Sequence, residues 1–456
     1  MTTTETITSI NPATGRPIAE YEPDEARVDA ALDRSVAAFR DWRRQSSATR
    51  ASVLTAAAHI LRDRQEEFAR LMTSEMGKPI GEARSEVEKC AWACDYFAEN
   101  GEHLLAPEPA PSDASESFVR FDPLGTVLAV MPWNFPFWQV FRFAAPALMA
   151  GNAGILKHAS NVPGCSRAIE EIFREAGAPE GVFQSLLIGA QTATSLVADD
   201  RIAAVTLTGS EAAGSAIGRA AGEAIKPSVL ELGGSDPFII LADADLDAAM
   251  DAAVKARVIN SGQSCIAAKR FIVEAPVYQQ VVDGMRERMQ ALRVGDPMDD
   301  ETDVGPLARR DLVDDLEDQL KASVHEGARL AAGGNPVDGA GFFFQPTLLA
   351  ECRPEHTAMR EETFGPLAAI AKVADADEAI RVANDSRYGL GAAIFTESAR
   401  GKTLAPEIES GHVAVNGIVK SDPRLPFGGI KRSGYGRELA EPGIRSFVNV
   451  KTVWIA

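Results

Sequence analysis

The sequence predicts an α/β protein with two doubly wound parallel sheets and a small additional β element. Short apolar segments alternate with helical patterns from residue 127 onward, a rhythm typical of parallel sheets covered by helices. The chain has 456 residues, more than one hydrophobic core usually organises, so two or three structural units are expected. Hydrophobic residues at 45% and charged residues at 24% are ordinary for a soluble globular protein.

Two helical segments are expected near the start of the chain. Residues 24–43 and 47–75 have apolar residues at helical spacing, and both segments begin near plausible capping residues. A first series of strands separated by helices then follows. Its strands are expected at 127–131, 154–157, 185–188, 204–208 and 228–231.

A second series of strands follows Gly233 and Gly234, where we place the boundary between the two α/β units. Its strands are expected at 271–273, 367–373, 391–395 and 412–415, separated by helices such as 276–292. The chain shows no repeat of roughly 20 to 50 residues and no low-complexity tract.

The stretch 123–141 carries no charged residue and has the length of a membrane span. Its prolines at 123, 132 and 136 and the polar side chains of Asn134 and Gln139 would leave polar groups unpaired in lipid. We therefore expect a strand, an active-site loop and the start of a helix in this stretch.

The net charge of −19 repels nucleic acid and anionic membrane surfaces. We therefore expect a small-molecule substrate, no nucleic-acid partner and no membrane partner. An anionic substrate would need a local site of positive charge, which makes buried arginines informative.

The cysteines indicate a reducing compartment, the cytoplasm. They are odd in number and too scattered for a disulfide framework. The first residues, 1–5, also lack the basic start and apolar core of a secretory signal. No metal site is expected, because Cys90 and Cys94, the two cysteines nearest each other in the sequence, have no neighbouring set of His or Asp residues that could complete one. The five cysteines are Cys90, Cys94, Cys165, Cys265 and Cys352.

Cys265 is the candidate nucleophile, and Glu231 is the candidate base. Cys265 ends the run Asn-Ser-Gly-Gln-Ser-Cys at 260–265, and Glu231 precedes Leu-Gly-Gly at 232–234. A placed thiol can begin carbonyl chemistry, and a carboxylate can activate water to finish it. A lone cysteine is more often part of a core, but the polar setting of Cys265 favours a catalytic role.

A parallel sheet favours nucleotide binding at the carboxyl ends of its strands, but the usual glycine fingerprint is missing. The segment 209–214 has the glycine spacing of a phosphate loop, yet Ser215 and Ala216 follow it instead of Lys and Ser or Thr. Taken alone, this glycine signal is weak, and a strand-to-helix turn that binds no ligand explains the segment better.

Seven motifs in order nevertheless resemble the aldehyde dehydrogenase family over nearly the whole chain. This family binds its dinucleotide in a variant Rossmann unit without the usual fingerprint, so two Rossmann-like units are implied. The motifs are Pro-Trp-Asn-Phe-Pro at 132–136, Gly-Asn at 151–152 leading to Lys157, Thr-Gly-Ser at 208–210, Glu-Leu-Gly-Gly at 231–234, Gly-Gln-Ser-Cys at 262–265, Glu-Thr-Phe-Gly-Pro at 362–366 and Pro-Phe-Gly-Gly at 426–429.

The resemblance implies oxidation of an aldehyde to a carboxylic acid. Cys265 would attack the aldehyde carbon to form a thiohemiacetal, whose oxygen would be stabilised by the Asn134 amide and the backbone N–H of Cys265. Hydride transfer to the cofactor would leave a thioester, which water activated by Glu231 would hydrolyse.

The same resemblance places Lys157 and Ser160 beside the adenine-side ribose. Many NAD-selective relatives have Glu at the later position, and a carboxylate there would repel the 2′-phosphate of NADP. Ser160 permits NADP, which we expect to be mildly favoured over NAD. The other implied cofactor contacts are Trp133, Gly209, Ser210, Leu232, Glu362 and Phe364.

Substrate choice depends on Arg142 and Ser421. The family's succinate-semialdehyde dehydrogenases have arginine at the spacing of Arg142 from Asn134, so these two residues are expected to bind the distal carboxylate of succinate semialdehyde. Some members have a second arginine where this chain has Ile259. The alternatives are a structural ion pair for Arg142, another semialdehyde or small neutral aldehyde as substrate, and a non-catalytic dinucleotide-binding relative.

The C-terminal segment 446–455 alternates like a strand and is too apolar for a free edge. Similar segments in the family pair across subunits, so with a hairpin around 116–127 we expect a homodimer or homotetramer; the alternative is pairing within the chain. The resemblance thus implies a dinucleotide-binding domain at 1–106 and 128–232, a catalytic domain at 233–415, and an oligomerisation element at 107–127 and 436–456.

Overall fold

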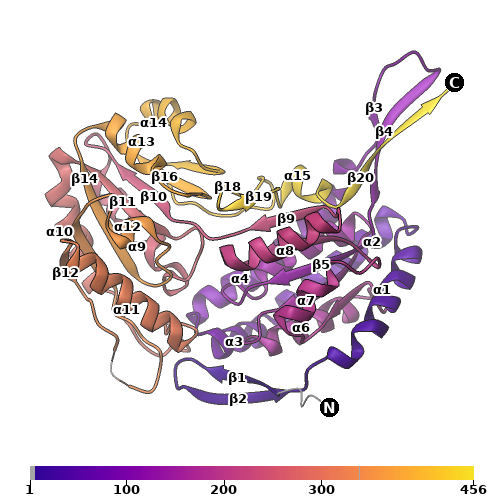
Figure 1. The fold of residues 1–456 in the computed structure, drawn as a ribbon, viewed down its shortest axis with the longest axis horizontal. Coiled ribbons are helices and arrows are strands. Elements are labelled where there is room, and N and C mark those ends of the chain that lie inside the picture. The colour runs from indigo at the N-terminus through magenta and orange to yellow at the C-terminus, as the bar shows by residue number, and fades with distance from the viewer. Residues whose placement is uncertain (1–5, 338) are drawn as a thin grey trace.

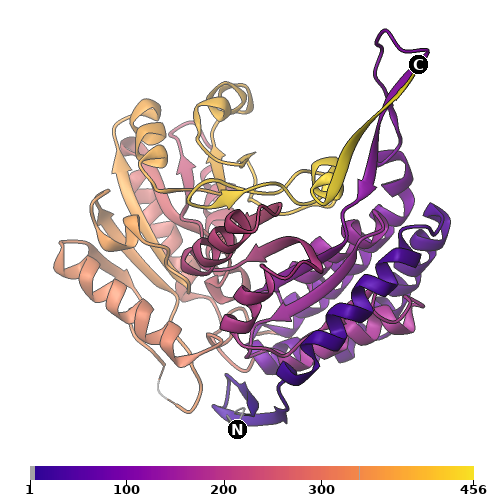
Figure 2. The same cartoon turned by 45° about the vertical axis from the view of Figure 1, so that its right-hand side comes forward.

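The computed structural model describes residues 6–337 and 339–456. The signal-peptide prediction concerned residues 1–5, which lie outside the described residues. Two α/β halves lie side by side, and a β arm that ends at the C-terminus projects from one of them (Figures 1 and 2). The predicted α/β class with parallel sheets is confirmed.

The N-terminal region differs from the prediction in three ways, one of which is that helix α4 (Ile80–Leu104) was not predicted. The region begins with an unexpected antiparallel pair, β1 (Ile7–Asn11) and β2 (Arg16–Tyr21). The single helix expected at 47–75 is in fact two, α2 (Ser47–Asp63) and α3 (Gln65–Met76), because Arg64 leaves the helical conformation with φ −112° and ψ 25°. Helices α1 (Val28–Trp42) and α4 (Ile80–Leu104) complete this region.

The first large sheet has the strand order β19-β9-β8-β5-β6-β7. Its five consecutive strands are parallel and match the predicted series, although β7 lies a little earlier in the chain than expected. The unexpected β19 pairs antiparallel with β9. The strands are β5 (Thr126–Met131), β6 (Ala153–His158), β7 (Phe183–Ser185), β8 (Ile202–Thr208), β9 (Ser228–Glu231) and β19 (Gly434–Tyr435), with helices α5 (Trp138–Met149), α6 (Pro163–Glu175), α7 (Ala190–Leu196) and α8 (Glu211–Glu223).

The second large sheet has the order β12-β13-β14-β11-β10-β16-β17, and β12 is its antiparallel member. Strands β10, β12 and β13 were not predicted. The strands are β10 (Asp236–Ile240), β11 (Ala268–Glu274), β12 (Arg329–Ala332), β13 (Thr347–Cys352), β14 (Leu367–Val373), β16 (Gly391–Phe395) and β17 (His412–Val415), with helices α9 (Leu246–Val258), α10 (Tyr278–Gln290), α11 (Arg310–His325), α12 (Thr357–Arg360), α13 (Ala376–Asn384) and α14 (Ser398–Leu404).

The arm consists of β3 (Glu108–Pro109), β4 (Glu116–Pro123) and β20 (Val448–Ile455). Strand β20 pairs with β4 along its whole length, from Val448 opposite Pro123 to Ile455 opposite Glu116. The C-terminal strand thus pairs within its own chain, and the hairpin β3–β4 starts earlier than the expected range 116–127.

Short elements connect the arm to the two halves. Strand β15 (Tyr388–Gly389) pairs with β18 (Ile430–Lys431), and helix α15 (Ala440–Arg445) precedes β20. Within the described residues, none of the helices is both long and apolar enough to cross a bilayer.

Candidate active site

A cavity of about 220 Å³ brings most of the predicted site residues together. It lies at the carboxyl ends of β5, β8 and β9, where ligands of parallel sheets gather, and it faces the loop before β11. The predicted residues that line it are Trp133, Asn134, Gly209, Ser210, Leu232, Cys265, Glu362 and Phe364.

Cys265 is partly exposed, whereas the other four cysteines are buried. It follows a short turn in which Asn260 and Ser261 have φ values of 53° and 55°, a region that non-glycine residues rarely adopt and that marks functional loops. The Asn260 amide holds this turn by donating to the carbonyl oxygens of Asn134 at 2.7 Å and Gln263 at 3.1 Å.

The thiol of Cys265 is protonated at neutral pH in this conformation. Burial raises its pKa to about 12, although the charges of Arg142 and Lys269 act in the opposite direction. Since the thiolate is the nucleophile, the thiol must lose its proton before it can attack a carbonyl carbon.

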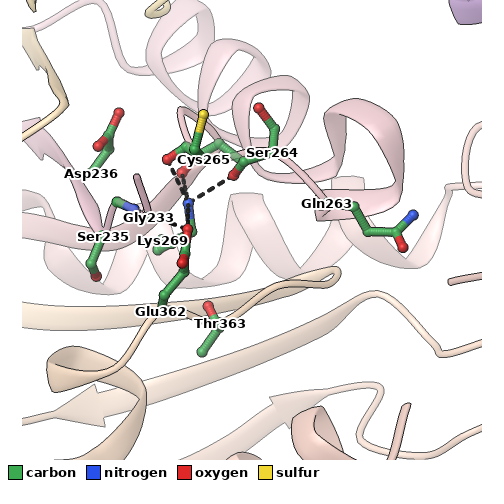
Figure 3. A network of polar contacts seen from close by, with 12 residues as sticks. Gly233, Ser235, Asp236, Gln263, Ser264, Cys265, Lys269, Glu362 and Thr363 are labelled. Carbon is green, nitrogen blue, oxygen red and sulfur yellow. Dashed lines mark hydrogen bonds and ion pairs between the residues drawn. The ribbon is translucent and has the colours of Figure 1, made fainter. Parts of the chain in front are cut away.

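Lys269 fixes the backbone around the nucleophile. Its buried ammonium group donates to the carbonyl oxygens of Ser264 at 2.9 Å, Cys265 at 2.9 Å and Ala267 at 3.0 Å. Figure 3 shows these bonds converging on the lysine, while the Cys265 sulfur points away from Lys269 and Glu362. The sequence analysis did not identify this lysine; its position four residues after Cys265 was the only available signal.

Asn134 is placed to stabilise an oxyanion. Its Nδ2 donates to the carbonyl oxygen of Gln263 at 3.0 Å, and the side chain lines the cavity beside Cys265. An amide nitrogen has two hydrogens, so one remains for a substrate oxygen.

Glu231 lies at the end of β9 but does not line the cavity. Both of its carboxyl oxygens lack a hydrogen-bond partner in the described structure. Gly428 packs against it so closely that a Cβ there would lie 2.6 Å from Oε1. Burial and then the neighbouring carboxyl of Glu438 raise the pKa of Glu231 well above its usual value, which favours the neutral form of the carboxyl.

Arg142 also lies outside the cavity and has partners of its own. On α5 it is 2% exposed, forms an ion pair with Glu438, and donates to Thr208 Oγ1 at 3.1 Å. Its guanidinium lies 4.7 Å from the centroid of the Phe427 ring. The alternative of a structural ion pair for Arg142 therefore describes this structure, and binding of a substrate carboxylate by Arg142 stays a prediction.

Ser421 lies apart from the cavity, and its Oγ accepts a hydrogen bond from Lys89 Nζ at 2.7 Å. Lys89, Glu438 and Asn260 are further residues that the sequence analysis missed. Each depends on a partner distant in the chain, so no local pattern could have found them.

The residues present fit a dinucleotide. Ser210 caps the N-terminus of α8, accepting from the backbone N–H of Ala213 at 3.3 Å, and a helix N-terminus attracts phosphate. The neighbouring Gly209 leaves the backbone open, because the nearest atom to a Cβ there is 3.7 Å away. Lys157 and Ser160 lie at and just after the carboxyl end of β6, outside the 220 Å³ cavity, and burial lowers the pKa of Lys157.

The other side of the cavity presents apolar rings and a carboxylate. Phe364 packs edge-on against Trp133 with 5.8 Å between ring centroids. Glu362 Oε1 accepts from the backbone N–H of Gly234 at 2.9 Å. Gly233 packs against the same carboxyl group, since a Cβ there would lie 2.3 Å from Glu362 Oε2 and would displace that side chain.

No group of three or more His, Cys, Asp or Glu side chains suited to a metal ion occurs within residues 6–337 and 339–456. The ring of the buried His158 forms hydrogen bonds only with backbone groups of the described chain, which indicates a structural role. Its ring nitrogens lie 2.8 Å from the carbonyl oxygen of Pro136 and 3.3 Å from that of Met131. Burial lowers the pKa of His158 to about 4.

Comparisons with known proteins point to one family. Residues 1–453 match the model of the aldehyde dehydrogenase family. A probable NADP+ succinate-semialdehyde dehydrogenase of Synechocystis is 53% identical over 452 residues, covering 99% of this chain and 100% of the relative. An NADP+ succinate-semialdehyde dehydrogenase of Mycobacterium avium is 50% identical over 455 residues, covering 98% and 96%.

A solved structure of a succinic semialdehyde dehydrogenase has a very similar fold. The succinic semialdehyde dehydrogenase of Streptococcus pyogenes, in complex with NADP+, superposes with a TM-score of 0.96 at 38% identity. The match covers 98% of this chain and 99% of that one.

Proposed function

The chain belongs to the aldehyde dehydrogenase family, and we propose that it oxidises succinate semialdehyde to succinate with NADP as the favoured hydride acceptor. The observation that carries the proposal is the single cavity that contains the Cys265 thiol, the Asn134 amide and the Trp133–Phe364 pair. The names of its relatives support the choice of substrate and cofactor.

The first half of the reaction forms a covalent adduct on Cys265. The thiol gives up its proton to solvent, and the resulting thiolate bonds to the aldehyde carbon while the carbonyl electrons move onto oxygen. The free hydrogen of the Asn134 amide and the backbone N–H of Cys265 donate to that oxygen. Bound NADP would supply the hydride acceptor, and loss of the hydride from the adduct leaves a thioester on Cys265.

The second half hydrolyses the thioester and needs Glu231 as base. Its carboxylate takes a proton from water, the water oxygen bonds to the acyl carbon, and the C–S bond breaks to return the thiolate. Because Glu231 is buried beneath Gly428 and does not line the cavity, its side chain must turn toward Cys265 and ionise for this step.

Lys157 and Ser160 favour NADP without excluding NAD. The lysine ammonium attracts a 2′-phosphate, and the exposed Ser160 hydroxyl can donate to it. We assign the pyrophosphate to Gly209 and Ser210 and the nicotinamide end to the remaining residues of the cavity. Those residues are Trp133, Leu232, Glu362 and Phe364.

We further propose that residues 1–106 and 128–232 bind the dinucleotide, that 233–415 supply the nucleophile, and that the arm mediates assembly into a dimer or tetramer. Strand β20 has one edge without a strand partner in the described part of the chain, and it exposes Val450 and Trp454. A cytoplasmic location fits the five free cysteines. Light scattering that finds a stable monomer would reject the assembly.

An aldehyde panel run with NAD and with NADP tests the function. We expect reduced-cofactor absorbance to rise fastest with succinate semialdehyde and NADP, and to be lost in Cys265→Ala. Equal rates with butyraldehyde would reject the substrate, and turnover in Cys265→Ala would reject the mechanism.

A further inference from the structure

A second and larger cavity of about 720 Å³ adjoins the catalytic one. Residues of α4, α9 and α10 line it, together with Phe135, Trp138 and Ile259. The segment 132–139 lines both cavities, since Asn134 and Gln139 face the one that holds Cys265. The larger cavity therefore reaches the wall of the catalytic site.

Lys89 on α4 presents an uncompensated positive charge to this cavity. Its Nζ lies 2.7 Å from Ser421 Oγ and 4.3 Å from the centroid of the Trp138 ring. Among the described residues, Lys89 forms no ion pair. The carboxylates that line the cavity have other partners, namely Asp251 with Arg288, Asp300 with Arg84, Glu86 with Lys78, Asp303 with the backbone of Arg293 and Glu82 with the backbone of Asn260.

The hydrogen bond from Lys89 to Ser421 leaves hydrogens on both side chains that could be donated to the same acceptor. An ammonium group has three hydrogens, and Lys89 uses one of them on Ser421 Oγ, so two remain. Because that oxygen accepts, the Ser421 hydroxyl hydrogen is free to donate elsewhere. A carboxylate at this position would receive donors from both side chains, in surroundings where charged hydrogen bonds are strengthened by burial.

Arg142 is less suited to this task. Its charge is already offset by Glu438, whereas Lys89 lines the larger cavity itself.

We propose that Lys89, together with Ser421, binds the distal carboxylate of the semialdehyde and thereby determines selectivity over neutral aldehydes. This inference rests on the proposed function and names the residue that recognises its substrate. Lys89 is a specificity residue, because it contacts the end of the substrate that does not react.

The test compares kcat/KM for succinate semialdehyde with kcat/KM for butyraldehyde, which has a methyl group in place of the carboxylate. In Lys89→Met we expect this ratio to fall about 10- to 100-fold, the worth of a charged hydrogen bond. Lys89→Arg should restore most of it. The control is Lys255→Met, another lysine lining the same cavity, which should change the ratio less than about twofold.

Using a ratio removes the effect of any loss of folded enzyme. If Lys89→Met does not fold, the same ratio is measured in Ser421→Ala, and calorimetry measures the affinity of that variant and of the wild type for succinate. A wild-type enzyme with no preference for the semialdehyde would reject the proposed function. A wild-type preference that survives in Lys89→Met would reject this inference alone.

Discussion

Arg142 and Glu438 form a buried ion pair whose side chains are only 2% and 5% exposed. The carboxyl of Glu438 also raises the pKa of Glu231, while Arg142 lowers it. The proposed base is therefore controlled by a pair that lies outside the catalytic cavity.

Replacing Glu438 by Gln should lower the pKa of Glu231, because it removes a negative charge and leaves Arg142 free to act on Glu231. The acid limb of the pH profile for thioester hydrolysis should move to lower pH in single-turnover experiments. The variant should also lose roughly 3–5 kcal/mol of unfolding free energy, since Arg142 stays buried without its partner. The matched control is Glu441→Gln, and an unchanged acid limb in Glu438→Gln would contradict the coupling.

Replacing Asn134 by Ala should reduce kcat about a hundredfold or more, as expected for the loss of one oxyanion donor worth about 3–4 kcal/mol. Steady-state kinetics with saturating semialdehyde would measure this loss. A kcat within a few-fold of wild type would show that the amide is only a structural partner of Gln263.

The pH dependence of KM should report Lys89. Burial, and then the charge of Arg142, lower the pKa of Lys89 to about 8. Its ammonium form predominates below this pH, so KM for succinate semialdehyde should rise as the pH increases through about 8, while KM for butyraldehyde should not follow. The groups that face Lys89 are Glu86 and Cys90 on its own helix, Arg142 on α5 and Asp422 beside Ser421.

Lys89→Arg should remove this rise in KM, because a guanidinium keeps its charge throughout the range. Burial raises the pKa of Cys90 well above its usual value, so this thiol stays neutral. A rise that persists in Lys89→Arg would assign the titration to another group.

Replacing Lys269 by Met should leave three backbone carbonyl groups around Cys265 without their donor. Each unsatisfied buried group costs about 1–3 kcal/mol, so we expect a lower melting temperature and a large loss of kcat. Calorimetry and steady-state kinetics would measure both. The exposed Lys372 on β14 provides the control, and equal behaviour of the two variants would show that Lys269 does not hold the loop.

Replacing Ser160 by Glu should shift cofactor preference toward NAD. A carboxylate beside the 2′-phosphate costs roughly 1–4 kcal/mol, so kcat/KM for NADP should fall about tenfold or more while the value for NAD changes little. Parallel loss with both cofactors would place Ser160 elsewhere than beside the ribose.

Local patterns were sufficient to predict much of the fold. The strand that ends at Glu231 and the strand at 391–395 were predicted within their observed bounds, because short apolar runs between helices are visible in the sequence. The break at Arg64 and the strand β12, two of whose four residues are exposed, were not. In these places the tertiary contacts decide the backbone, and the local pattern does not.

The sequence by itself indicated the alternation of strands and helices and the candidate reacting groups, since Cys265, Asn134 and Glu231 each lie in a recognisable local segment. Only the tertiary structure decided which buried charged side chains have a partner of opposite charge. Lys89 and Ser421 are 332 positions apart, and Arg142 meets Glu438 from a different part of the chain. Whether a buried charge is neutralised or left free to bind a substrate depends on which distant side chain folds against it.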